Sequence, residues 1–189
     1  GRLPTRTIDA TARLKTLGTP LTRRAADGPE DRERYERCIM GRSVPMEARA
    51  APRLMQIFHT ADHVVILNEQ NSEMRIVPLA GIPPLADPIR QWRGDARGRW
   101  EGDTLVVETT NFVDKTEYRW ANAWRMPTET MRVVERFRRV DEKTIDYELT
   151  IEDPAKFTRA WTISNPLTTD QASRGVTQGP LYEYACHEG

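Results

Sequence analysis

The sequence predicts a mainly β protein whose strands run antiparallel in an up-and-down meander. Apolar and polar residues alternate with a period of two, most clearly in 144–152, where Ile145, Tyr147, Leu149 and Ile151 alternate with polar residues. Short turn-forming segments separate most of the apolar stretches. No internal repeat and no heptad pattern competes with this interpretation.

Eight segments are expected to form the strands, at 54–60, 63–69, 74–79, 97–101, 104–110, 131–140, 144–152 and 158–164. Hairpin turns are expected at 61–62, 102–103 and 141–143. An eight-stranded meander tends to close into a barrel, because closure removes exposed edges. We therefore expect a lipocalin-like barrel, with a two-sheet sandwich as the alternative.

The length of 189 residues suits one domain. Residues 1–30 hold few large apolar side chains and several Pro and Gly residues, which predicts an extended N-terminal arm. Residues 31–189 are expected to form a single barrel-like domain. A short helix is predicted at 29–39, since Pro29 suits a first helical position and acidic residues fill the first turn.

Charge and motifs exclude several classes of function. Lys+Arg and Asp+Glu both number 28, and this balance argues against nucleic-acid binding, which needs surplus positive charge. No apolar run approaches the roughly 20 residues that span a bilayer. Nucleotide-binding and hydrolase motifs are absent, so no cofactor is expected.

Histidine is scarce, and His59, His63 and His187 are the three in the chain. They could meet around a metal only if the end of the chain packs against the first hairpin. The favoured interpretation is three hydrogen-bonding histidines near the surface, so no metal site is expected.

Two acidic residues accompany apolar strand faces. Glu135 falls on the same face as Val133 and Phe137, and Glu69 follows the apolar stretch at 63–67. An inward carboxylate is desolvated, which raises its pKa unless an arginine pairs with it. Such a group can serve as a general acid or base.

The predicted catalytic candidates are therefore Glu135 and Glu69, assisted by Arg97 and His59. A structural ion pair inside the barrel is the competing interpretation, and we favour it over catalysis. The candidate partners of the carboxylates are Arg75, Arg97, Arg99 and Arg136.

Aromatic side chains gather in the connection at 111–129. Tyr118, Trp120 and Trp124 lie there, and Tyr147 is predicted to face inward from its strand. Aromatic residues over a barrel mouth can line a site for an apolar ligand. The alternative is that they plug the end of the barrel.

The chain has two cysteines, Cys38 and Cys186. They can form a disulfide that closes a long loop, or remain two buried free thiols. The residues alone leave both alternatives open.

Several segments together resemble a known family. They are RGRWEGDTLVVETTNF at 97–112, VERF at 134–137, EDP at 152–154 and LYEYACHEG at 181–189. Over residues 35–189 the chain resembles a large family of uncharacterised exported bacterial proteins. The resemblance implies a periplasmic or secreted location and a Cys38–Cys186 disulfide. It implies no activity, cofactor or catalytic residue.

Three functions remain as hypotheses. The leading one is an exported barrel that binds a small, largely apolar ligand. The second is an acid–base enzyme (a lyase, isomerase or hydrolase) that uses an inward carboxylate. The third is a structural or assembly component of the envelope, whose residues 1–30 dock onto a protein partner.

Overall fold

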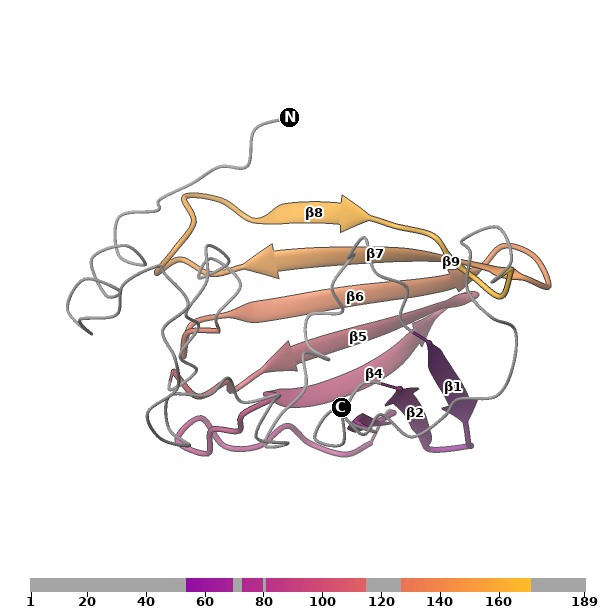
Figure 1. The fold of residues 1–189 in the computed structure, drawn as a ribbon. Helices are drawn as coiled ribbons and strands as arrows, with labels where there is room; N and C mark the ends of the chain where they lie inside the picture. The colour runs from indigo at the N-terminus through magenta and orange to yellow at the C-terminus, as the bar shows by residue number, and fades with distance from the viewer. Residues whose placement is uncertain (1–53, 70–72, 80, 115–126, 171–189) are drawn as a thin grey trace, which may run out of the picture.

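A computed structural model describes residues 54–69, 73–79, 81–114 and 127–170. These residues form antiparallel β-strands and contain no helix (Figure 1). The mainly β, antiparallel class predicted from the sequence is therefore confirmed. The predicted arm at 1–30 and the helix at 29–39 lie outside the described residues, as do both cysteines.

The first three strands make a small sheet in the order β1-β2-β3. Their bounds are Met55–His59 for β1, His63–Asn68 for β2 and Glu73–Pro78 for β3. Val64 and Ile66 of β2 and Val77 of β3 are buried on one face of this sheet, as the period of two requires.

The remaining strands make a larger sheet in the order β4-β5-β6-β7-β8, with β9 added beside β7. The bounds are β4 Asp95–Glu101, β5 Thr104–Thr110, β6 Arg132–Arg139, β7 Thr144–Glu152, β8 Trp161–Ser164 and β9 Leu167–Thr168. The two-residue β9 was not predicted, since the sequence analysis gives no strand between residues 165 and 170.

The predicted closed barrel is not found among the described strands, which form two separate sheets. β3 and β4 lie close together but share no ladder of hydrogen bonds. They are joined by a long connection that contains Pro83, Pro84 and Pro88. A proline-rich connection of this length is no tight hairpin turn, so it does not impose a pairing register on the strands that it joins.

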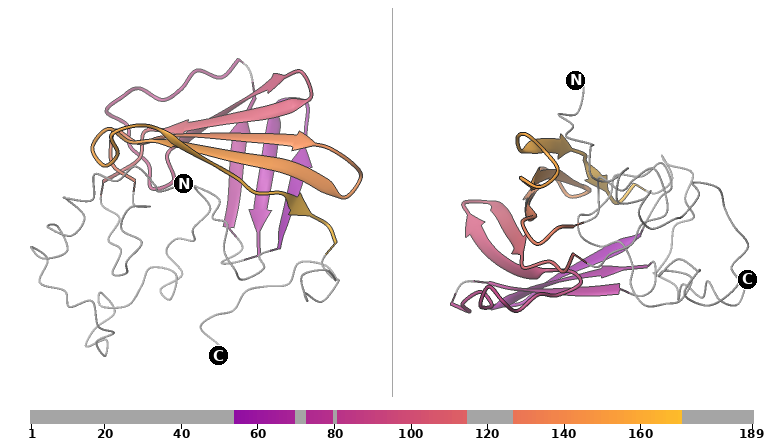
Figure 2. Two further views of the ribbon diagram at one scale, coloured as in Figure 1. Left: turned by 90° about the horizontal axis from the view of Figure 1, so that it is seen from above. Right: turned by 90° about the vertical axis from the view of Figure 1, so that its left-hand side faces the viewer.

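The core lies between the two sheets. The large sheet curls over one face of the small sheet, and the strands of the two sheets cross (Figure 2). Gly98 lets β4 approach the small sheet, because a Cβ there would lie 2.9 Å from Leu79 Cδ2 and 3.0 Å from Val77 Cγ1. The largest fully buried apolar side chains are Phe112, Ile66, Ile151, Val64, Val77, Val106, Val107 and Val133.

Candidate functional site

A buried polar cluster joins the two sheets inside the core. The alternation along β6 turns Glu135 inward, where it is 0% exposed. Oε2 of Glu135 lies 2.5 Å from Nη2 of Arg75 on β3. The hydroxyl of Tyr147 donates a hydrogen bond to Oε1 of Glu135 at 3.0 Å. Nη2 of Arg75 also donates to Oγ1 of Thr109 on β5 at 2.8 Å.

This geometry matches a structural ion pair more closely than an acid–base site. Both oxygens of Glu135 face a polar partner, and neither Glu135 nor Arg75 lines the pocket described below. A general base must reach the proton that it abstracts, within hydrogen-bond distance of a bound substrate. Glu135 does not line the pocket described below, and both of its oxygens lie against polar side chains of the core.

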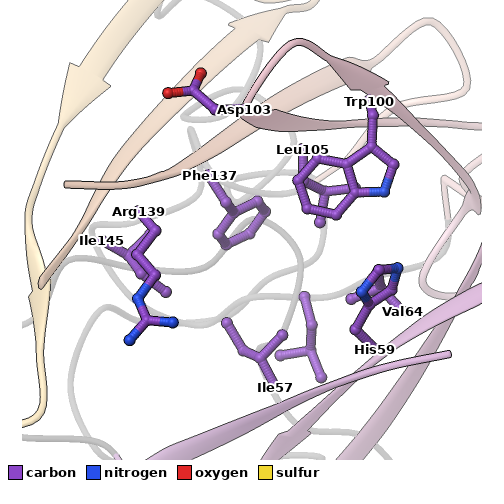
Figure 3. A pocket seen from close by; sticks show the side chains of 10 residues that line it. Ile57, His59, Val64, Trp100, Asp103, Leu105, Phe137, Arg139 and Ile145 are labelled. Carbon is purple, nitrogen blue, oxygen red and sulfur yellow. The ribbon is translucent and has the colours of Figure 1, made fainter. Parts of the chain in front are cut away.

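An apolar pocket of about 130 Å³ opens near the ends of the two sheets (Figure 3). The hairpins β1–β2, β4–β5 and β6–β7 all contribute to it. Most of its wall is aliphatic or aromatic. Its lining residues are Ile57, His59, Val64, Ile66, Trp100, Asp103, Leu105, Phe137, Arg139 and Ile145.

Two rings stand together at one side of the pocket. The rings of His59 and Trp100 have centroids 5.4 Å apart and are tilted by 58°. Trp100 is 49% exposed even though it lies on a strand. Figure 3 shows both rings beside the cavity, with the guanidinium of Arg139 on the opposite side. The pocket therefore combines an apolar wall with polar groups only at its edge.

The predicted catalytic residues do not converge. Arg97 pairs with Asp95 at 2.5 Å and donates from Nη2 to the carbonyl of Pro83 at 2.7 Å. Glu69 directly follows β2, where its backbone N–H donates to the carbonyl of Leu54 at 3.0 Å. His59 lines the pocket, whereas Glu135 lies in the ion pair.

The predicted ligand-binding residues are described only in part. Tyr147 is buried beside Glu135, and its ring lies 5.0 Å from that of Phe137, a lining residue of the pocket. Tyr118, Trp120 and Trp124 lie outside the described residues. The predicted site at the aromatic connection therefore lies outside the described residues.

Arg139 is a pocket residue that the sequence analysis missed. It follows Val133, Glu135 and Phe137 at intervals of two along β6, so Arg139 lies on the same face of the sheet as Glu135, although it is exposed at the end of the strand. The alternation of Val133, Glu135 and Phe137, continued by one more step of two residues, reaches Arg139. Trp100 also lines the pocket and was not among the predicted site residues.

The outer face of the large sheet carries ion pairs that hold neighbouring strands. Arg132 on β6 binds Glu108 on β5, with Nε–Oε1 at 2.7 Å and Nη2–Oε2 at 3.0 Å. The hydrogen bonds from Arg132 lower the pKa of Glu108. Arg136 and then Arg99 likewise lower the pKa of Glu101 through hydrogen bonds.

Within the described part of the chain, no group of three or more His, Cys, Asp or Glu side chains is arranged to hold a metal ion. The same residues contain no helix long and apolar enough to cross a membrane. Comparison of the chain with known protein families, with curated proteins and with solved structures finds no match.

Proposed function

We propose that the protein binds a small, largely apolar ligand in the pocket between the two sheets. The observation that carries this proposal is the pocket itself, which is open and mostly apolar. A hydrophobic cavity of about 150 Å³ can accept a benzene-sized molecule. The volume of about 130 Å³ therefore favours a single ring or a short branched chain, with any larger part of the ligand projecting from the mouth.

The binding hypothesis fits the described residues better than catalysis does. Ligand sites are typically concave and apolar, with a few polar groups that fix orientation. His59 and Arg139 are such groups at this pocket. The acid–base alternative requires a carboxylate that faces open space, whereas Glu135 is held by Arg75 and Tyr147.

Ligand-observed NMR with neutral probes tests the proposal. We expect saturation transfer from the protein to cyclohexylmethanol and to toluene. Ile57→Trp should fill the pocket from β1 and weaken binding at least about tenfold, since each 1.4 kcal/mol of lost contact is tenfold in affinity. Gln56→Trp is the matched control, because it places the same side chain on the opposite face of β1.

Two outcomes would count against ligand binding. If the wild-type protein gives no saturation transfer with either probe, the pocket does not bind small apolar molecules. If Ile57→Trp and Gln56→Trp bind as well as the wild type, the probes bind somewhere other than this pocket.

We also propose that the protein is exported and carries a Cys38–Cys186 disulfide. The support is the family resemblance of 97–112 and 181–189. A disulfide is stable in the periplasm or outside the cell and rare in the cytosol. The protein is isolated from its source in the presence of an alkylating agent, and its mass is measured before and after reduction. We expect two cysteines to become alkylated only after reduction. Two free thiols before reduction would contradict both the disulfide and the export argument.

A further inference from the structure

Arg139 is an exposed charged residue at the end of a strand, beside an apolar cavity. It is the last residue of β6 and lies on the inner face of the large sheet, in line with Phe137. Ile145 of β7 is its partner across the ladder, and both residues line the pocket. Its guanidinium therefore stands at the edge of an apolar cavity (Figure 3).

The guanidinium is fixed by the turn that follows β6. Nε of Arg139 donates to the carbonyl of Asp141 at 3.0 Å, and Nη2 donates to the carbonyl of Glu142 at 3.4 Å. A guanidinium has five N–H donors. Nη1 donates to no atom of the described residues, so its N–H groups are available to a ligand.

The positive charge of Arg139 has no direct ion pair within the described part of the chain. The other arginines of β6 do have one: Arg132 with Glu108, Arg136 with Glu101 and Arg138 with Asp146. The backbone carbonyls that hold Arg139 are neutral acceptors. They orient the guanidinium without cancelling its charge.

The carboxylates of Asp103, which lines the pocket, and of Asp141, whose carbonyl accepts from Arg139, have other hydrogen-bond partners. Asp103 lines the pocket, but Figure 3 shows its carboxylate turned away from the cavity, and it accepts a hydrogen bond from the Thr104 hydroxyl at 3.1 Å. Asp141 accepts the backbone N–H of Lys143 at 2.7 Å. That hydrogen bond is the main cause of the lowered pKa of Asp141, and Arg139 contributes least.

We propose that the ligand of the pocket is a small amphipathic monoanion, an organic carboxylate whose apolar body fills the cavity and whose charged end binds Arg139. This inference rests on the proposed ligand-binding function. A planar guanidinium pairs well with a carboxylate, and hydrogen bonds between charged groups are shorter and stronger than neutral ones. A single arginine at the mouth favours one negative charge over a phosphate dianion.

Three probes of nearly equal shape and different charge test the inference. They are cyclohexanecarboxylate, cyclohexylmethanol and cyclohexylmethylamine, measured by calorimetry at neutral pH and low salt. We expect the carboxylate to bind the wild-type protein about tenfold more tightly than the alcohol, because a charge-assisted hydrogen bond is stronger than a neutral one. The amine should bind more weakly than the alcohol.

Variants of two adjacent arginines identify the group responsible. Arg139→Gln should lose the preference for the carboxylate and keep the affinity for the alcohol. Arg139→Lys retains the charge and should retain the preference. Arg138→Gln is the matched control, because Arg138 faces outward and pairs with Asp146 at 2.7 Å; it should behave as the wild type.

The outcomes separate this inference from the proposed function. Equal binding of carboxylate and alcohol to the wild type, or a preference that survives in Arg139→Gln, overturns the anionic ligand and leaves apolar binding intact. If none of the three probes binds, both proposals fail.

Discussion

Arg75 of β3 and Glu135 of β6 form an ion pair that crosses the core from the small sheet to the large one, with Nη2 and Oε2 2.5 Å apart. The Arg75 side chain is 4% exposed and that of Glu135 is 0% exposed. The two sheets share no backbone ladder between β3 and β4, and this pair is a polar contact that joins them inside the core.

Removal of either partner should destabilise the protein strongly. Arg75→Met leaves the Glu135 carboxylate buried without its cation, and Glu135→Leu leaves the guanidinium without its anion. We expect each single variant to lose about 3–5 kcal/mol of the free energy of unfolding, the usual cost of an unpaired buried charge. Urea denaturation at pH 7 measures the loss.

The double variant Arg75→Met/Glu135→Leu should be far more stable than the sum of the two losses predicts. Nε and Nη1 of Arg75 have no hydrogen-bond partner among the described residues, so the desolvation cost of the pair is only partly offset. A double variant whose loss equals the sum of the single losses would show that the two side chains do not interact.

Gly98→Ala should destabilise the contact between the two sheets. The added Cβ would lie 2.9 Å from Leu79 Cδ2 and 3.0 Å from Val77 Cγ1, so one of these side chains must move. Overpacking of this kind costs about 1–3 kcal/mol, which thermal or urea unfolding can measure.

Gly102→Asn is the control for Gly98→Ala. Gly102 has φ of +62°, a conformation that Asn tolerates, and no described atom lies within 4 Å of its Cβ position. We expect only a small change for this variant. Equal stability of Gly98→Ala and the wild type would mean that β4 and the small sheet are less tightly packed than the structure shows.

The ion pair of Glu108 and Arg132 should make stability depend on pH. Its hydrogen bonds with Arg132 lower the pKa of Glu108 below the ordinary 4.5, so the folded state binds fewer protons there than the unfolded state. The stabilisation is therefore complete above about pH 4.5 and is lost as the pH falls through the lower, folded-state pKa.

Glu108→Gln isolates this contribution. Since Glu108 is partly exposed, we expect the variant to be less stable than the wild type by only about 0.2–1 kcal/mol at pH 7. In parallel urea titrations, the difference in stability between the variant and the wild type should shrink as the pH falls below about 4.5. It should also shrink at pH 7 when the salt concentration is raised to about 1 M. If the difference in stability stays constant as the pH falls well below 4.5, the ionised form of Glu108 does not stabilise the fold.

The sequence was sufficient to predict most strands and the inward position of Glu135, because both follow from a period of two within one strand. β6, β7 and the turn between them lie close to the predicted bounds. The sequence could not show that the sheet breaks between β3 and β4. That break depends on how a long connection packs, which no local pattern encodes. The identity of the arginine that pairs with Glu135 was open for the same reason.

The pocket was missed because three hairpins that are distant in the sequence build it. Nothing in the sequence of each strand marks Ile57, Trp100 or Ile145 as a pocket residue. They line one cavity only because the two sheets cross. Arg139 differs, because its place on the same face of the sheet as Glu135 follows from the alternation along β6. The sequence does not show, however, that other hairpins place an apolar cavity beside it.

Trp100 should report on occupation of the pocket. It lines the cavity and is 49% exposed, so a bound ligand would remove water from its indole. Saturation with cyclohexylmethanol should shift the tryptophan emission to shorter wavelength. Trp100→Phe should bind the same probe, as measured by calorimetry, without that shift.

Trp92→Phe is the control, because Trp92 is also exposed but does not line the pocket. This variant should retain the emission shift. An unchanged shift in Trp100→Phe would place the bound probe beside a different tryptophan.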